Sequence, residues 1–114
     1  MPYITVRTAK TLDEKCKTNY SLEMGKTISV LPGKTIDVTI VVIEDGCTIY
    51  KSGEPFDGVF IEVRLYKQSP EDAKKDYTEI LFKITEDILN IPPERTCISY
   101  LELPSWGING QYLP

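Results

Sequence analysis

Histidine is absent from this 114-residue chain, so the side chain that most often carries protons near neutral pH is missing. The only cysteines are Cys16, Cys47 and Cys97, an odd and widely spaced set without a Cys-x-x-Cys motif. Such a set supplies neither a zinc site nor a disulfide framework. We therefore expect three unpaired cysteines, each a small buried hydrophobe, and neither a metal ion nor another cofactor.

An excess of positive charge is also lacking. Lysine and arginine number 13 against 17 acidic residues, which gives a net charge of −4. Nucleic-acid and anionic-membrane binding require a basic stripe, so neither kind of partner is expected. No apolar run approaches the ~18 residues of a membrane span, and the N-terminus lacks the features of a signal peptide. The expected location is the cytoplasm, and secretion by a route without a signal peptide stays open.

What the chain does contain is enough apolar sequence for one core. The 41% hydrophobic content is typical of a packed domain rather than a disordered one, and the length fits a single domain over residues 1–114.

The hydrophobic pattern alternates between strands and helices. A short strand at 3–8 precedes a helix at about 12–29, with Thr11 and Glu14 in the positions of a capping box. A β-branched run at 35–43 reads as a strand buried on both sides, and a short strand is expected at 47–50. A half-buried strand over 59–66 follows. Ser69 and Pro70 then begin a helix that runs to about residue 89, before a last long strand at 96–103.

The two halves of this pattern are related by a constant offset. Subtracting 57 from the numbers of four residues of the second half gives Pro2, Cys16, Tyr20 and Met24 of the first; the four are Val59, Ala73, Tyr77 and Leu81. The glycine-rich segments 47–53 and 105–110 also correspond. We therefore predict an α+β fold in which two β-α-β units, 2–57 and 58–114, form one four-stranded mixed sheet with two helices on one face, plus short strands. The uncovered face predicts self-association.

The start of the chain, Met1-Pro2-Tyr3-Ile4, holds the most suggestive chemistry. Removal of Met1 would leave Pro2 with a free secondary amine at the tip of an apolar strand. Terminal amines have a pKa of ~7.7–8.0, and burial or a nearby cation lowers it. Such an amine would serve as a general base near pH 7. Many proteins also begin with Met-Pro without any such role, so the dipeptide alone decides nothing.

Taken with the two β-α-β units, four segments give a resemblance that runs from end to end: Met1-Pro2, Pro32-Gly33-Lys34, Pro92-Pro93-Glu94-Arg95 and Trp106-Gly107-Ile108-Asn109-Gly110. The chain resembles the tautomerase superfamily, and within it the group of macrophage migration inhibitory factor (MIF) and phenylpyruvate-type tautomerases. The resemblance implies a homotrimer with active sites between neighbouring subunits and Pro2 as the catalytic base. It also implies that Lys34 contacts the carboxylate of a small 2-oxo acid, with a contribution from the backbone of Tyr66.

Other positions depart from that family or have two readings. Cys97 stands where the cytokine-like members carry tyrosine, Ser99 where they carry asparagine, and Leu65-Tyr66-Lys67 where relatives have Ser-Ile-Gly. Apolar residues that would line the site are Tyr3, Trp106 and Leu113, although core or interface packing explains them equally well. Lys34 also fits as an ordinary cation near a helix C-terminus.

Two functions of different classes follow from these residues. The first is a keto–enol tautomerase, or a related decarboxylase or hydratase, acting through Pro2. The second is a weakly active or inactive trimer that serves in binding or signalling.

Overall fold

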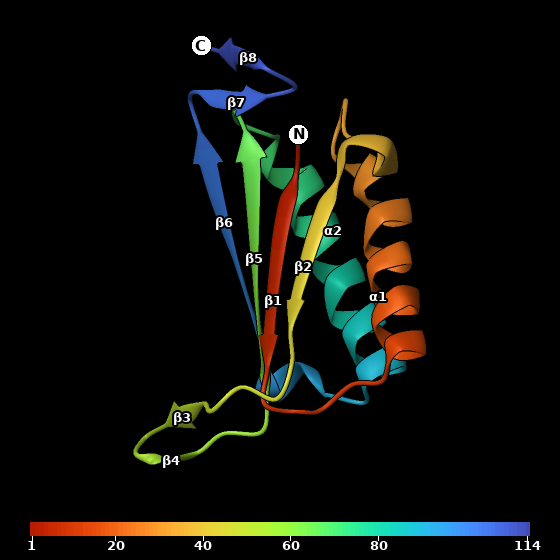
Figure 1. Ribbon diagram of the computed structural model, residues 1–114, viewed down its shortest axis with the longest axis vertical. Helices are drawn as coiled ribbons and strands as arrows, with labels where there is room; N and C mark the ends of the chain where they lie inside the picture. Colours follow the sequence, from red (N-terminus) through yellow and green to blue (C-terminus); the bar gives the residue numbers. More distant parts are fainter.

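The computed structural model describes residues 1–114. Its main sheet has four strands, β1 (Tyr3–Thr8), β2 (Ile40–Glu44), β5 (Val59–Tyr66) and β6 (Thr96–Leu103), in the order β2-β1-β5-β6. β1 pairs with β2 and β5 with β6 in parallel, whereas the central pair β1 and β5 is antiparallel. The predicted mixed sheet of two β-α-β units is confirmed (Figure 1).

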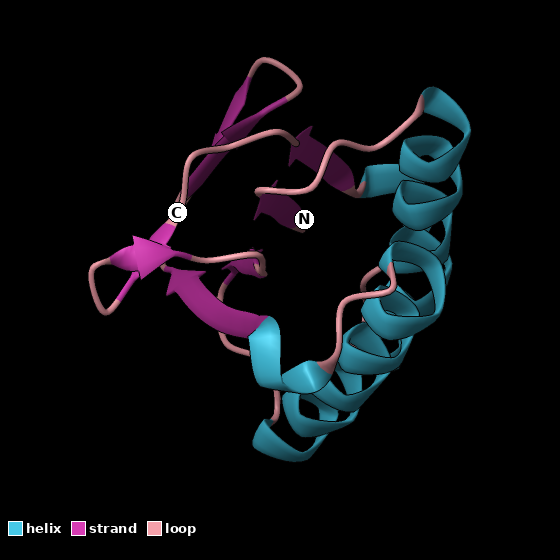
Figure 2. Ribbon diagram, turned by 90° about the horizontal axis from the view of Figure 1, so that it is seen from below, coloured by secondary structure: helices cyan, strands magenta, loops and turns pink.

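Both helices, α1 (Glu14–Thr27) and α2 (Glu71–Ile84), lie on one face of the sheet (Figures 1 and 2). The core forms there because alternate strand residues point toward the helices, and Ile4, Ile61 and Val63 are completely buried. Each such side chain contributes about 1.5–3 kcal/mol through burial. No helix in this structure is long and apolar enough to cross a membrane.

The repeat also places two tyrosines at equivalent points between the helices. Tyr20 and Tyr77 are fully buried, and each hydroxyl has a partner. Tyr20 Oη lies 2.7 Å from Oγ1 of Thr85, and Tyr77 Oη donates to the carbonyl of Met24 at 2.8 Å. These two hydrogen bonds therefore join α1 to α2 and its η3 extension inside an apolar core.

The opposite face of the sheet has no helix over it (Figure 2). Its apolar side chains Ile40, Phe60 and Leu101 are 40–48% exposed. Two ion pairs lie on the same face: Arg7 of β1 with Glu44 of β2, and Arg64 with Glu62 within β5. A single subunit thus leaves one broad, partly apolar sheet surface without a partner.

The β-branched run at 35–43 is only partly strand, which corrects one expectation. Residues Ile36–Val38 form the 3₁₀ turn η2, and β2 begins at Ile40. β2 is an edge strand whose residues are half-buried or exposed, and it is not buried on both sides as expected. The hydroxyl of Thr39 donates to the carbonyl of Thr35 at 2.7 Å, a local bond that competes with strand pairing. Gly25 of α1 leaves room for Ile36, since a Cβ there would lie 2.7 Å from Ile36 Cγ1.

Helix ends differ from the expected ones. Asp13, not Thr11, caps α1, because its carboxylate accepts from the Cys16 amide at 2.8 Å. Ser69 makes no side-chain cap; Pro70 is the N-cap residue of α2. The expected helix to residue 89 ends its α-helical part at Ile84 and continues as the π-helical turn η3 (Thr85–Leu89).

Two short hairpins complete the fold at opposite ends of the sheet (Figure 1). The strand expected at 47–50 is the hairpin β3 (Tyr50–Lys51) and β4 (Glu54–Pro55), and the glycine-rich tail is the hairpin β7 (Trp106–Ile108) and β8 (Gln111–Leu113). Both turns need positive φ at two residues, Ser52-Gly53 and Asn109-Gly110. These pairs also differ by 57 in number, so the repeat extends through the hairpins.

The remaining helical turns are short. Turn η1 (Ile28–Val30) extends α1, and η4 (Pro93–Arg95) leads into β6. Cys16, Cys47 and Cys97 are all free, but the expectation that they are buried is wrong: Cys16 and Cys47 are half-buried and Cys97 is exposed.

Candidate active site at the N-terminal end of the sheet

Pro2 lies at the start of β1, at the end of the sheet where β5 and β6 finish (Figure 1). The residue is buried, and its carbonyl accepts a hydrogen bond of 3.1 Å from the amide of Ile40. Pairing with β2 therefore fixes the backbone at the first residues of the chain. An amine at the start of the chain is therefore held in a defined position by strand pairing.

Lys34 reaches the same end of the sheet from the loop after α1. Pro32 and Gly33, with φ of 77° at the glycine, form a tight turn closed by a 3.1 Å bond from the Lys34 amide to the Leu31 carbonyl. The ammonium group of Lys34 donates to the backbone carbonyl of Tyr66 at 3.2 Å. No carboxylate lies within 4 Å of this ammonium, so its charge is available to an anionic ligand.

The electrostatics of the site favour a neutral amine. Burial, then the positive charge of Lys34 and a hydrogen bond with it, lower the pKa of the Met1 amino group to about 6. The Met1 amine is therefore largely unprotonated at pH 7 and able to accept a proton.

The predicted lining residues Tyr3, Trp106 and Leu113 lie on two elements, β1 and the β7–β8 hairpin. Tyr3 faces Arg64 across the sheet, with the guanidinium carbon 5.9 Å from the ring centroid. Trp106 pairs with Leu113 in the β7–β8 hairpin. Tyr66 links that hairpin to β5, because its hydroxyl donates to the carbonyl of Pro114 at 2.6 Å.

Cys97 and Ser99 lie elsewhere in the subunit. They pair with Phe60 and Glu62 of β5, whereas Tyr3 pairs with Arg64. Cys97 instead borders a cavity of about 210 Å³ at the β3–β4 end of the sheet, among apolar residues and Lys51. Within one subunit the structure brings together Pro2, Lys34 and Tyr66, and leaves Cys97 and Ser99 apart from them.

Two cations near the site did not emerge as site residues from the sequence, Arg64 and Lys67. Arg64 reads as an ordinary strand-face residue because only the fold stacks it on Tyr3. Lys67 has a positive φ of 64°, and its Nζ lies 5.1 Å from the centroid of the Tyr66 ring. Its one signal in the sequence is that Leu65-Tyr66-Lys67 departs from the Ser-Ile-Gly that the resemblance implies. No cluster of three or more metal-ligating side chains is present.

Comparison with solved structures identifies the fold. The MIF2 structure from Leishmania major superposes with a TM-score of 0.90 at 21% identity, covering 99% of this chain and 97% of that one. The chain has the fold of the tautomerase superfamily. Other tautomerase-fold structures agree. Pt0534 inactivated by 2-oxo-3-pentynoate has a TM-score of 0.85 at 17% identity, with 95% and 93% coverage. The R7 fused 4-OT wild-type asymmetric trimer has a TM-score of 0.86 at 14% identity, with 96% and 94% coverage.

The tautomerase-fold likeness rests on three-dimensional structure. No protein-family model matches the sequence, and no significant match was found among curated proteins.

Proposed function

We propose that this protein is a keto–enol tautomerase of small 2-oxo acids, with the Pro2 amine as its general base once Met1 is removed. The observation that carries the proposal is the position of Pro2, which is buried, held by the 3.1 Å bond from the Ile40 amide, and preceded along the chain by a Met1 amine whose pKa burial and Lys34 lower. A base with a pKa near the working pH is the most effective proton carrier, and this chain has no histidine for the task.

The chemistry needs one group that both removes and returns a proton. In the enol-to-keto direction, Pro2 takes the proton of the enol hydroxyl as the carbonyl forms. Its ammonium then gives a proton to the adjacent carbon, and the amine returns to its neutral state. General acid–base catalysis of this kind contributes about 10²–10⁴-fold.

Lys34 would hold the carboxylate of the substrate next to Pro2. Its ammonium offers three donors, one of which is used by the Tyr66 carbonyl at 3.2 Å. Its positive charge would also lower the pKa of the neighbouring amine and keep it neutral. Lys34 would thus both bind the substrate and adjust the base. Tyr3, Trp106 and Leu113 would surround the remainder of the substrate and exclude water.

The proposal includes a homotrimer in which neighbouring subunits complete each site. The uncovered sheet face with Ile40, Phe60 and Leu101 supports self-association, and the R7 fused 4-OT structure is itself a trimer. Cys97 and Ser99, which lie away from Pro2 in one subunit, would come from the adjacent subunit. Sedimentation equilibrium should give three times the 12.9 kDa chain mass, and a monomer at micromolar concentration would contradict the shared site.

A second function, an inactive or weakly active trimer used for binding, is favoured by one observation. Cys97 and Ser99 stand where the resemblance implies the larger polar side chains of tyrosine and asparagine, so the polar lining of the site is thinner. A third possible function for the same site is a decarboxylase or hydratase that uses the same amine.

Ketonisation of enol-phenylpyruvate, followed by ultraviolet absorbance, separates these functions. Met1-free and Met1-bearing protein, each verified by intact mass, are compared side by side. With Met1 attached the Pro2 nitrogen is an amide, and the primary amine of Met1 lies about 3.8 Å further along the chain. Displacement of this size abolishes efficient proton transfer, so only the Met1-free protein should be active. Equal rates in both preparations would exclude Pro2 as the base.

A further inference from the structure

The peptide group between Tyr66 and Lys67 makes a hydrogen bond at each end. Its N–H, on Lys67, donates to the carbonyl of Leu103 in β6 at 2.8 Å. Its C=O, on Tyr66, accepts from the ammonium of Lys34 at 3.2 Å. The N–H and C=O of a trans peptide point in opposite directions, so the bond to β6 turns the carbonyl toward Lys34. β1 pairs with β5 no further along than Arg64, which leaves the Tyr66 carbonyl to Lys34.

The chain turns away from the sheet immediately after this peptide, at a strained residue. Lys67 has φ of 64°, in the left-handed region that glycine tolerates and other residues rarely adopt. Such a conformation persists only where the surrounding structure holds it. Rotation of the Tyr66–Lys67 peptide by about half a turn, the difference between type I and type II turns, would return φ to negative values. The same rotation would point the carbonyl away from Lys34.

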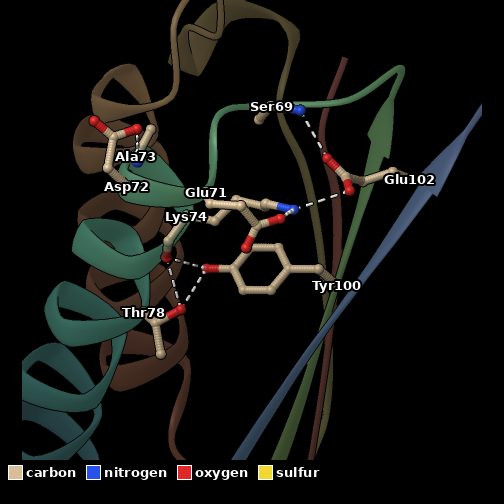
Figure 3. Close-up of polar contacts among 8 residues, drawn as sticks. All are labelled: Ser69, Glu71, Asp72, Ala73, Lys74, Thr78, Tyr100 and Glu102. Atoms are coloured by element: carbon tan, nitrogen blue, oxygen red, sulfur yellow. Dashed lines mark hydrogen bonds and ion pairs between the residues drawn. The ribbon is translucent and has the colours of Figure 1, made fainter.

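Glu102 of β6 holds the turn through a second, charged contact (Figure 3). Its Oε2 accepts from the amide of the buried residue Ser69 at 2.7 Å, and its Oε1 accepts from the ammonium of Lys74 at 2.9 Å. Lys74 belongs to α2, and the side chains of Glu102 and Lys74 are only 20% and 12% exposed. Hydrogen bonds to an ionised acceptor are among the stronger ones in proteins. The chain is therefore fixed between β6 and α2 two residues after Lys67.

We infer that Glu102 is a positioning residue: it keeps the carbonyl of Tyr66 turned toward Lys34, and so holds the ammonium of Lys34 beside the N-terminal amine. The inference rests on the proposed function, in which Lys34 binds the substrate carboxylate and Pro2 is the base. Glu102 acts through the strained peptide, since its own contacts lie in the turn and on α2. Without it the peptide can rotate, and the flexible side chain of Lys34 loses the acceptor that fixes its position.

Three substitutions separate the hydrogen bond of Glu102 from its charge. Glu102→Met removes both. Glu102→Gln removes the charge but keeps an amide oxygen that can accept from Ser69. Glu102→Asp keeps the charge, but its side chain is one methylene shorter and falls short of the Ser69 amide. The matched control is Glu71→Gln, which removes the other carboxylate that contacts Lys74, at 2.8 Å.

The first measurement is an NMR titration of the Pro2 amine in each variant, in Met1-free protein labelled with ¹⁵N-proline. In Glu102→Met and Glu102→Asp the pKa of this amine should rise toward the ordinary range, because the cation beside it is no longer held in place. In Glu102→Gln and Glu71→Gln it should stay near the wild-type value. The titration needs no catalysis.

Ketonisation of enol-phenylpyruvate gives the second measurement. A carbonyl turned away from Lys34 weakens carboxylate binding, so KM rises by the inverse of the correctly turned fraction. In Glu102→Met, KM should rise about fivefold, the scale of the strain that rotation relieves, with kcat nearly unchanged. Lys67→Gly makes the left-handed turn without strain, so it should restore KM when combined with Glu102→Met.

The outcomes separate the inference from the proposed function. A higher amine pKa in the Met and Asp variants of Glu102 but not in Glu102→Gln, together with rescue of KM by Lys67→Gly, supports the positioning role. An effect of charge alone would lower the pKa in both uncharged variants, and a purely structural role would leave pKa and KM at wild-type values; either result overturns the inference. Absence of ketonisation in the wild type, with the expected order of pKa values, would instead contradict Pro2 as the base and still support Glu102 as the residue that positions Lys34.

Discussion

Lys34 Nζ donates to the carbonyl of Tyr66 at 3.2 Å, which joins the loop after α1 to the last residue of β5. After burial, the same ammonium lowers the pKa of the Met1 amine. A cation, the N-terminal amine and the end of β5 therefore lie together at one end of the sheet. The proposed chemistry depends on this arrangement more than on any other feature of the subunit.

Replacing Lys34 with Met should reduce kcat/KM for enol-phenylpyruvate about 10- to 100-fold, the scale of a hydrogen bond to a charged group. The pKa of the N-terminal amine should rise, because the cation that lowers it is gone. The acidic limb of the pH–rate profile should then move to higher pH. Lys15→Met is the matched control, and an unchanged profile in Lys34→Met would show that Lys34 lies outside the site.

The electrophile 2-oxo-3-pentynoate, which inactivates Pt0534, should label Met1-free protein at Pro2. The amine nitrogen would form a bond to the alkyne carbon remote from the carbonyl, and a proton would be added to the neighbouring carbon. Peptide mass mapping should find one adduct on the N-terminal peptide. A label confined to Cys97, which is exposed, would argue against a reactive amine.

Tyr20→Phe should lower the free energy of unfolding by about 1–3 kcal/mol. The hydroxyl of Thr85 is fully buried and would lose its 2.7 Å partner, which leaves a polar group unsatisfied in the core. Tyr112→Phe, at a side chain that is 72% exposed, should change stability by less than about 0.5 kcal/mol. Urea unfolding at one fixed protein concentration makes the comparison, since association alters apparent stability. Equal midpoints for the two variants would refute this account of the helix pair.

Glu102 should make the fold sensitive to acid. The Ser69 amide, and then Lys74, lower the pKa of this carboxyl below its usual range. Its stabilising contribution is therefore complete above the usual glutamate pKa of about 4.3 and is lost as pH falls through the lower pKa of the folded state. The Glu102→Gln variant should lose less stability than wild type between about pH 5 and pH 2, as followed by thermal unfolding. Glu79→Gln, at an exposed position of α2, should behave as wild type does.

Much of the fold could be predicted because the chain repeats itself. The 57-residue offset relates Tyr20 to Tyr77, both buried and hydrogen-bonded in the structure, and it continues to the hairpin turns at Ser52 and Asn109. Alternation of apolar residues over 59–66 predicted β5 correctly. Periodic burial and turn-forming residues depend on the local sequence, so they can be predicted from it.

The errors arose where tertiary contacts or competing side chains decide the outcome. Residues 36–38 look like a strand, yet a Thr39 to Thr35 bond and the space at Gly25 favour a 3₁₀ turn. Asp13 displaced Thr11 as the cap of α1 because its carboxylate reaches the Cys16 amide. At the site, Lys34 could be anticipated, but the contact of Arg64 with the Tyr3 ring could not, because only the fold brings their two strands together.

The most direct test of the account is a titration of the Pro2 amine in Met1-free protein labelled with ¹⁵N-proline, set against the pH dependence of kcat/KM. The pKa from NMR should lie clearly below the ~7.7–8.0 of an ordinary terminal amine. It should coincide with the acidic limb of the kcat/KM profile, which reports the essential base of the free enzyme. A pKa in the ordinary range, or a rate that does not follow this titration, would contradict the assignment of Pro2 as the base.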